Sequence, residues 1–320
     1  MSDRVTVLVG DVLERLRELG DESVHCVVTS PPYWGLRDYG VEGQIGLEET
    51  PAEYIAALVL VFREVRRVLR RDGTCWLNLG DTYIGGRNGG MGERSCITSQ
   101  RNHAAARDAW LAQGGRVHRR VPGFKAKDLV GIPWRVALAL HADGWWLRSD
   151  VIWHKPSPMP ESVRDRPSRA HEYVFLLTRS ERYWYDADAI RTPQKTLGEH
   201  HEGRSGYRNN HPSKDGITER ALHPVGANAR TVWTIAQEPY AAAHFATFPR
   251  KLVEPCVLAG CPADGVVLDP FAGSGTALEV ALRLGRRAIG IELNPAYVAL
   301  IQERLVGLQY PLPIHGGGGL

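Results

Sequence analysis

The sequence predicts an α/β fold in which a mostly parallel sheet carries an antiparallel pair of strands at one edge. Two segments support the parallel part. Residues 51–79 have the pattern of an amphipathic helix followed by a strand, and residues 266–294 that of a strand, a glycine-rich turn, a helix and a second strand. Such alternation is typical of parallel sheets. The apolar runs 172–178 and 183–185 predict a β-hairpin for the antiparallel part.

Length and composition indicate one large domain with a substantial core. The chain has 320 residues, 43% of them hydrophobic, and a net charge of +3. We assign residues 1–310 to a single domain and residues 311–320 to a flexible tail. The sequence has neither a run of ~20 apolar residues nor a signal-peptide pattern, and its five cysteines lie mostly in apolar context, so we expect a cytoplasmic protein. No cysteine or histidine spacing predicts a metal site.

The N-terminal elements lead to an unusual proline-containing run. A short strand at 5–9 ends in Gly10-Asp11, where Asp11 has the residue type of a helix N-cap. The apolar run 24–28 then predicts a buried strand that continues directly into Thr29-Ser30-Pro31-Pro32-Tyr33-Trp34. Two prolines stiffen the backbone and donate no N–H, so its carbonyls remain open as acceptors. We interpret this run as a reaction centre; the alternative is an ordinary turn.

The middle of the chain contains two segments with the composition of insertions. After the helix that Pro51 opens, Asp72-Gly73 predicts a turn into a strand at 74–79. Residues 82–127 then hold nine Lys and Arg against two acids, a larger excess than that of the whole chain. We interpret this segment as an insertion whose cations follow nucleic-acid phosphates, the alternative being a loop without a partner. Residues 187–230 are again irregular, and follow a strand at 149–154 and the predicted hairpin.

The C-terminal strand–turn–helix–strand unit has the pattern of a nucleoside-binding site. Its turn reads Asp269-Pro-Phe271-Ala-Gly273-Ser-Gly275-Thr, and Glu292 ends the next strand. Glycines allow the backbone to approach a ligand, and a carboxylate at a strand end accepts from ribose hydroxyls. A dinucleotide site would have a small residue where this chain has Leu278, which disfavours an NAD-dependent oxidoreductase.

Together, TSPPYW, DPFAGSGT and IELNP resemble the DNA amino-methyltransferases that modify cytosine N4 or adenine N6. Their order resembles the permuted β arrangement of that family, in which the catalytic tetrapeptide precedes the cofactor-binding strand, and the matching segments run from about Val5 to Leu305. The resemblance implies a Rossmann-like methyltransferase fold, S-adenosylmethionine as cofactor and double-stranded DNA as substrate. It leaves open a monomer or homodimer and a cognate restriction endonuclease.

The resemblance also implies roles for individual residues. Ser30 Oγ and the Pro31 carbonyl would accept hydrogen bonds from the target amine, Pro32 would add rigidity, and Tyr33 would stack on the flipped base. Trp153 and its neighbours resemble a segment near the target base, although Trp153 also suits the core. The cofactor-binding residues would be Asp11 at the adenine, Phe248 and Asp269 at the methionine part, Phe271 at the adenosine, Gly273 and Gly275 in the turn, Glu292 at the ribose, and Thr29 and Asn294 beside them.

Two further expectations concern specificity. Serine before the proline pair is typical of N4-cytosine enzymes, so we expect cytosine as the target, with N6-adenine as the alternative. Residues 187–230 occupy the position at which the permuted family carries target recognition, and we expect them to read the DNA sequence. A non-catalytic protein that binds S-adenosylmethionine or DNA is a rival from another class, disfavoured by the intact run from Ser30 to Tyr33.

Overall fold

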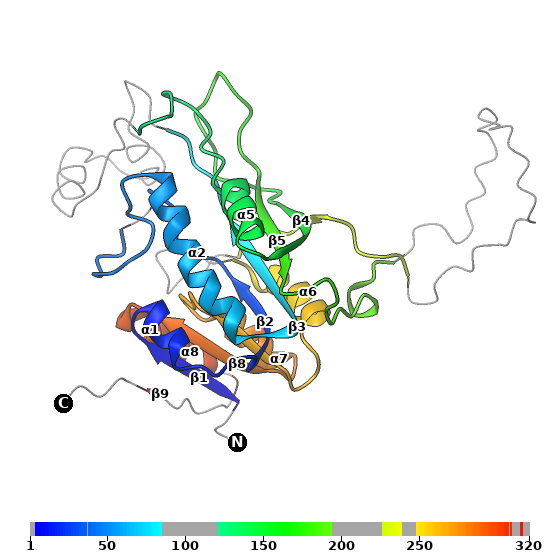
Figure 1. Ribbon diagram of the computed structural model, residues 1–320. Coiled ribbons are helices and arrows are strands. Elements are labelled where there is room, and N and C mark those ends of the chain that lie inside the picture. Colours follow the sequence, from blue (N-terminus) through cyan, green and yellow to red (C-terminus); the bar gives the residue numbers. More distant parts are fainter. Residues whose placement is uncertain are drawn as a thin grey trace, which may run out of the picture.

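A computed structural model describes residues 4–36, 38–84, 121–193, 226–238, 248–306, 308 and 314–315. Within these ranges the strands form one nine-stranded sheet in the order β6-β4-β5-β3-β2-β7-β8-β1-β9 (Figure 1). The described strands pair in parallel except where β5 meets β3 and β4. The predicted class, a mostly parallel sheet with an antiparallel pair, is confirmed. In chain order the strands are β1 (Val5–Val9), β2 (Val24–Thr29), β3 (Leu69–Leu79), β4 (Trp146–His154), β5 (His171–Thr178), β6 (Val232–Thr234), β7 (Val266–Asp269), β8 (Arg287–Glu292) and β9 (Ile314–His315).

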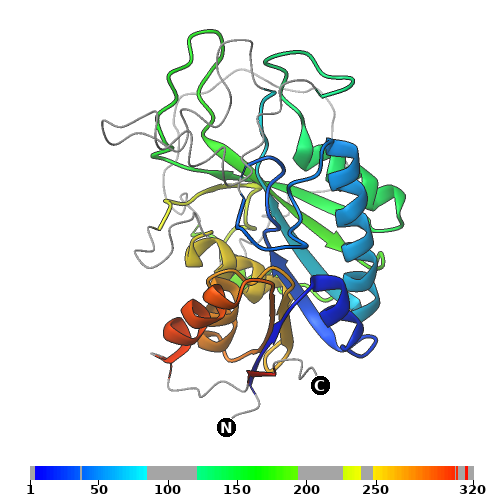
Figure 2. The same ribbon diagram turned by 90° about the vertical axis from the view of Figure 1, so that its left-hand side faces the viewer.

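Helices cover both faces of the sheet, as the two core clusters and the turned view in Figure 2 show. One face carries α1 (Val12–Arg17), α2 (Pro51–Val68) and α5 (Ile132–Ala142), and the other carries α6 (Arg250–Gly260), α7 (Thr276–Arg283) and α8 (Pro295–Val306). A short 3-10 turn, η1 (Asp188–Ile190), contacts α6. Burying both faces explains why the central strands read as continuous apolar runs rather than alternating ones.

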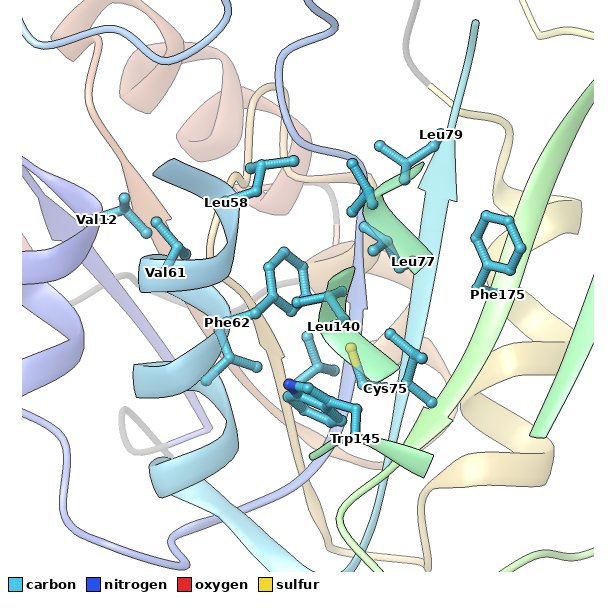
Figure 3. Packing of buried hydrophobic residues seen from close by; sticks show 14 of the residues in the cluster. Val12, Leu58, Val61, Phe62, Cys75, Leu77, Leu79, Leu140, Trp145 and Phe175 are labelled. Atoms are coloured by element: carbon cyan, nitrogen blue, oxygen red, sulfur yellow. The ribbon is translucent and has the colours of Figure 1, made fainter. Parts of the chain in front are cut away.

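Helix α2 begins and packs as its sequence predicts. Thr50 and Glu53 form a reciprocal capping box, and Pro51 occupies the first turn, where its missing N–H costs nothing. The apolar stripe of α2 then faces the sheet, and Figure 3 shows Leu58 and Phe62 pointing toward the side chains of β3. Phe62 meets the buried Trp145 edge to face, with ring centroids 6.3 Å apart. This packing fixes β3, whose end supports the site described below.

Two local predictions are wrong. Residues 183–185 form no strand; Trp184 N–H instead donates to the Asp72 carbonyl at 2.9 Å, and the antiparallel partners of β5 are β3 and β4. Asp72-Gly73 is not a turn, because β3 continues from Leu69 to Leu79. The extra length is absorbed by a register shift against β2, where Val24 pairs with Leu69 but Cys26 pairs with Thr74.

Most of the two predicted insertions, 82–127 and 187–230, lies outside the described residues, but their ends are visible. Tyr83 forms a β-bridge with Leu129, and Thr192 forms one with Ala227. Each segment therefore leaves and re-enters the fold at one place. Of the predicted tail 311–320, Ile314–His315 forms β9 beside β1 and the other residues are not described.

A buried charge cluster ties three helices together next to the glycine turn. Glu279 of α7 is 4% exposed and accepts from Arg250 (3.3 Å), Arg283 (2.9 Å) and Arg304 (3.3 Å). Arg304, itself buried on α8, also donates to Thr276 Oγ1 at 2.7 Å. The cluster thus anchors the turn that starts α7 against α8.

We expect Glu279→Gln to lower the free energy of unfolding by about 3 kcal/mol, because it removes the negative charge that Glu279 places beside the buried Arg304 guanidinium. Urea denaturation followed by circular dichroism measures the change. Arg283→Gln is the matched control, since Arg283 is half exposed and its ion pair should contribute less than about 1 kcal/mol. Equal losses of unfolding free energy in the two variants would contradict the role of Glu279 as the centre of the buried charge cluster.

Candidate active site

The carboxyl ends of β2, β7 and β8 are neighbours in the sheet and open into one cavity of about 350 Å³. The run after β2 contributes Ser30 and Tyr33 to its lining, the turn after β7 contributes Gly273, and the end of β8 contributes Glu292. Ligands of open α/β sheets bind at such strand ends. The two motifs, which lie far apart in the sequence, therefore meet in one site.

A buried hydrogen bond joins the two motifs directly. Thr29 Oγ1 donates to Asp269 Oδ1 at 2.6 Å, across 240 positions of sequence, and both residues are 1% exposed. The Phe271 N–H donates to the same carboxylate oxygen at 3.1 Å. Because β2 and β7 also pair in parallel, the proline run and the glycine turn are held in fixed relation.

The proline run is braced from behind by aromatic side chains. The buried Tyr54 of α2 donates its hydroxyl proton to the Pro32 carbonyl at 2.8 Å. Trp34, 2% exposed, donates its indole N–H to the Glu48 carbonyl at 2.9 Å. With both prolines fixing φ, the backbone at Ser30 and Pro31 is set before any ligand arrives.

Tyr33 is held at its hydroxyl and along its ring. The hydroxyl oxygen lies 2.8 Å from Glu172 Oε2, 3.2 Å from Asn78 Oδ1 and 3.3 Å from Ser30 Oγ. A Cβ at Gly80 would lie 2.4 Å from the ring, so only glycine lets the ring lie against β3's end. Burial, followed by the Glu172 charge, raises the pKa of Tyr33 well above its usual range, so the hydroxyl keeps its proton.

Glu172 in turn forms an ion pair with Lys155, and both side chains are largely buried. Asn78 donates from its amide nitrogen to Glu172 Oε2 at 3.2 Å and to the Tyr173 carbonyl at 3.1 Å. The Lys155 ammonium also lies 4.4 Å from the centre of the Trp153 ring. All four of these side chains, on β3, β4 and β5 or just beyond, reach the cavity beside Ser30: Asn78, Trp153, Lys155 and Glu172.

Two carboxylates with raised pKa values lie at the ends of β7 and β8. Burial raises the pKa of Asp269 to about 7, and its Oδ2 is buried with no hydrogen-bond partner among the described residues. Burial also raises the pKa of Glu292 to about 7. The Gly273 and Asn294 N–H groups each donate to one Glu292 oxygen at 2.8 Å, which fixes the carboxylate and leaves each oxygen a further lone pair.

This pair of carboxylates fits S-adenosylmethionine. An unpartnered buried carboxylate oxygen suits an ammonium group, and a carboxylate oriented by two backbone donors suits the two hydroxyls of a ribose. Gly273, with φ of 52°, lines the cavity in a backbone conformation that favours glycine.

The remaining predicted residues fall into two groups. Asp11 caps α1, its Oδ1 accepting from the N–H groups of Leu13 (2.9 Å) and Glu14 (3.1 Å), and it also lines the cavity together with Phe248, Phe271 and Asn294. Thr29, Asp269 and Gly275 are absent from the lining. A Cβ at Gly275 would lie 3.1 Å from Ile301 of α8, so this glycine serves helix packing in the described fold.

Sequence reasoning missed Glu172, Asn78, Gly80 and Tyr54, and noticed Lys155 only as part of the tryptophan segment. One signal was available in the sequence: Glu172 is the only acid in the otherwise largely apolar run His171–Thr178 and lies near its start. A carboxylate at a strand end beside an expected reaction centre is a candidate functional group. Its partner Tyr33 lies 139 positions away, so only the folded chain reveals the pairing.

The fold and the site together define an S-adenosylmethionine-type methyltransferase architecture. The model of the DNA methylase family matches residues 24–303. The chain belongs to this family, whose members use S-adenosylmethionine and methylate either cytosine N4 or adenine N6. It is a Type II DNA methyltransferase of the kind found in restriction–modification systems.

Relatives in sequence agree with this assignment, and solved structures agree with the fold. The chain is 46% identical over 303 residues to Type II methyltransferase M.Cfr9I of Citrobacter freundii, covering 94% of this chain and 88% of the relative. It is 45% identical to M.SmaI of Serratia marcescens, with 94% and 90% covered. The fold is similar to PvuII DNA methyltransferase (cytosine-N4-specific), with TM-score 0.62, 20% identity and 95% and 88% coverage. It is also similar to TTHA0409 from Thermus thermophilus, complexed with S-adenosyl-L-methionine, with TM-score 0.60, 24% identity and 98% and 99% coverage.

Two features are absent from the described residues: a helix that could cross a membrane and a group of side chains that could hold a metal ion. None of their helices combines the length and apolar character that a membrane crossing needs. Their His, Cys, Asp and Glu side chains form no group of three or more that is arranged to hold a metal ion.

Proposed function

We propose that this protein transfers a methyl group from S-adenosylmethionine to the exocyclic N4 of cytosine at a specific site in duplex DNA. The observation that carries the proposal is the single cavity shared by Ser30, Pro31 and the turn at Gly273 with Glu292. A hydroxyl-and-carbonyl acceptor pair beside a nucleoside pocket supports direct transfer between two bound molecules, with proximity supplying much of the rate.

We assign to the protein the role of accepting hydrogen bonds from the target amine. An exocyclic base amine is a weak nucleophile because its lone pair is delocalised into the ring. Ser30 Oγ and the Pro31 carbonyl accept from its N–H groups and so localise that lone pair. The bound cofactor supplies a methyl group made electrophilic by a sulfonium. The amine nitrogen would take up that methyl group as the bond from carbon to sulfur breaks, and it would release one proton to solvent.

For the cofactor, we assign the ammonium group to Asp269 and the ribose hydroxyls to Glu292. The partnerless Asp269 Oδ2 and the two backbone donors that hold Glu292 support these assignments. Asp11 at the adenine amine and Phe248 and Phe271 at apolar parts of the ligand are supported by their place in the cavity lining.

Cytosine is favoured over adenine by the serine at position 30, and N6-adenine is the alternative. The target base has to leave the duplex to reach the cavity, at a cost on the order of a few kcal/mol. We assign sequence reading to residues 187–230 and phosphate contacts to the basic residues of 82–127. The Type II relatives support a cognate restriction endonuclease as a partner in the cell.

The test is transfer of a labelled methyl group from S-adenosylmethionine to duplex DNA, followed by nucleoside analysis and mapping of the modified site. We expect N4-methylcytosine, and a Ser30→Ala variant should be slower by roughly 10²- to 10³-fold because the amine loses one acceptor. Recovery of N6-methyladenine alone would overturn the base assignment. Binding of the cofactor without transfer to any DNA would favour the non-catalytic rival.

A further inference from the structure

We infer that Glu172 sets the direction of a hydrogen-bond chain through the Tyr33 and Ser30 hydroxyls, and thereby makes Ser30 Oγ an acceptor toward the target amine. Glu172 is thus a positioning residue, which acts through the two hydroxyls. The inference rests on the proposed function, in which Ser30 receives a hydrogen bond from the base.

The chemistry of a hydroxyl group constrains Ser30. A serine hydroxyl has one proton and two lone pairs, so it can either donate to a neighbour or accept from it. For Ser30 Oγ to accept from an N–H of the base, its own proton has to point away from the base. The Tyr33 hydroxyl oxygen lies 3.3 Å from Ser30 Oγ and can receive that proton. It can do so only if the Tyr33 proton also points elsewhere.

Two acceptor oxygens determine where the proton of the Tyr33 hydroxyl points. Glu172 Oε2 lies 2.8 Å from the Tyr33 hydroxyl and Asn78 Oδ1 lies 3.2 Å from it. The orientation of the Asn78 amide follows from its own contacts, because its nitrogen donates to Glu172 and to the Tyr173 carbonyl. Tyr33 therefore faces acceptors on that side and donates to them.

Lys155 completes the arrangement from the far side of Glu172. Its ammonium pairs with Oε1, whereas Tyr33 and Asn78 use Oε2, so the two carboxylate oxygens have separate tasks. Lys155 and Glu172 are 14% and 16% exposed at their side chains, so water competes little for these bonds. In the resulting chain of hydrogen bonds, the amine donates to Ser30, Ser30 donates to Tyr33, and Tyr33 donates to Glu172. Each of these bonds polarises the next.

The direction of these hydrogen bonds predicts a specific effect of replacing Glu172 by the neutral glutamine. Glu172→Gln keeps the shape and one acceptor oxygen but adds an NH₂ group that can donate to the Tyr33 oxygen. The Tyr33 proton is then free to turn toward Ser30, and the Ser30 proton toward the amine. A reversed chain presents a proton where the base needs a lone pair.

The experiment compares binding of two duplexes that carry the mapped site, in the presence of S-adenosylhomocysteine. One has cytosine at the target position and the other has 2-pyrimidinone, which lacks only the amino group. We expect the ratio of cytosine to 2-pyrimidinone affinity to be roughly tenfold lower in Glu172→Gln than in the wild type. The weaker pairing of 2-pyrimidinone favours its flipping equally in both proteins and cancels in this comparison. Single-turnover methyl transfer by this variant should fall roughly 100-fold, with cofactor affinity unchanged.

A second variant tests whether the effect comes from the direction of the hydrogen bonds or from a change in local structure. In Glu172→Gln, the added change Asn78→Asp places a carboxylate at the other acceptor position of Tyr33 and should restore most of the preference for the amine. Glu64→Gln is the matched control, because Glu64 is also an ion-paired glutamate with little exposed side-chain surface but lies on α2 beside Arg67. We expect it to behave as wild type.

The outcomes distinguish the two proposals. A Glu172→Gln protein that keeps both the amine preference and the transfer rate would overturn the inference, as would loss that Asn78→Asp does not restore. If mapping returns N6-methyladenine, the base assignment fails, and the same comparison made with adenine and purine at the target tests the hydroxyl chain independently.

Discussion

Gly80→Ala should reduce methyl transfer at least about 100-fold while leaving cofactor affinity within about twofold of wild type. The added Cβ would lie 2.4 Å from Cε2 and 2.9 Å from Cδ2 of Tyr33. The ring has little freedom to yield, since its hydroxyl is held by Glu172 and Asn78 and the residue before it is a proline. Moving the ring disturbs both the base-stacking surface and the hydroxyl next to Ser30.

Single-turnover kinetics and equilibrium dialysis with S-adenosylmethionine measure the two quantities. Gly20→Ala is the control, because a Cβ there meets no atom within 4 Å and the backbone is not in the left-handed region. Wild-type turnover in the Gly80→Ala protein would show that catalysis does not depend on the position of the Tyr33 ring.

The second large effect is on cofactor binding by Asp269. We expect Asp269→Asn to weaken S-adenosylmethionine binding roughly 10- to 100-fold, because the amide cannot offer a charge to the ammonium group. In the wild type, burial raises the pKa of Asp269 and of Glu292 to about 7. The bound cation and ribose hydroxyls favour the ionised carboxylates, so binding releases protons and affinity falls as pH drops below about 7.

Calorimetry between pH 6 and 7.5, in buffers with different ionisation enthalpies, measures both the affinity and the protons released. This range lies below the titration of an α-amino group near pH 8. We expect roughly tenfold or greater weakening at pH 6 in the wild type and a shallower dependence in Asp269→Asn, which retains only Glu292. Asp264→Asn, a change at an exposed ion pair with Arg4, is the control. A pH-independent wild-type affinity would contradict the role of both carboxylates.

The sequence was informative where a local pattern determines geometry. The proline run after an apolar strand, and a glycine turn between strand and helix, are readable because each depends on neighbouring residues. Their meeting in the folded chain agrees with the rule that ligands of open α/β sheets bind at the carboxyl ends of parallel strands. Asp11 illustrates the same point, because an Asp before a helical pattern is a local N-cap signal and the cap is present.

Other features depend on pairing between distant segments. Residues 183–185 are aromatic and suit a strand, but Trp184 bonds to Asp72 and the rings of Tyr183 and Tyr185 pack against each other, with centroids 6.1 Å apart. The importance of Gly80 is equally invisible in sequence, since it arises from a ring contributed by another strand end. Glu172 is an ordinary strand residue until β5 is placed beside β3.

The bond between Thr29 and Asp269 has a consequence for how the enzyme comes into being. These residues stand 240 positions apart, and β2 cannot acquire its neighbour β7 until the ribosome has made nearly all of the polypeptide. Contacts of such long sequence separation form late and slowly. The segment with the proline run is therefore synthesised well before the segment with the glycine turn, and we expect a nascent or truncated product that lacks β7 to have no methylating capacity.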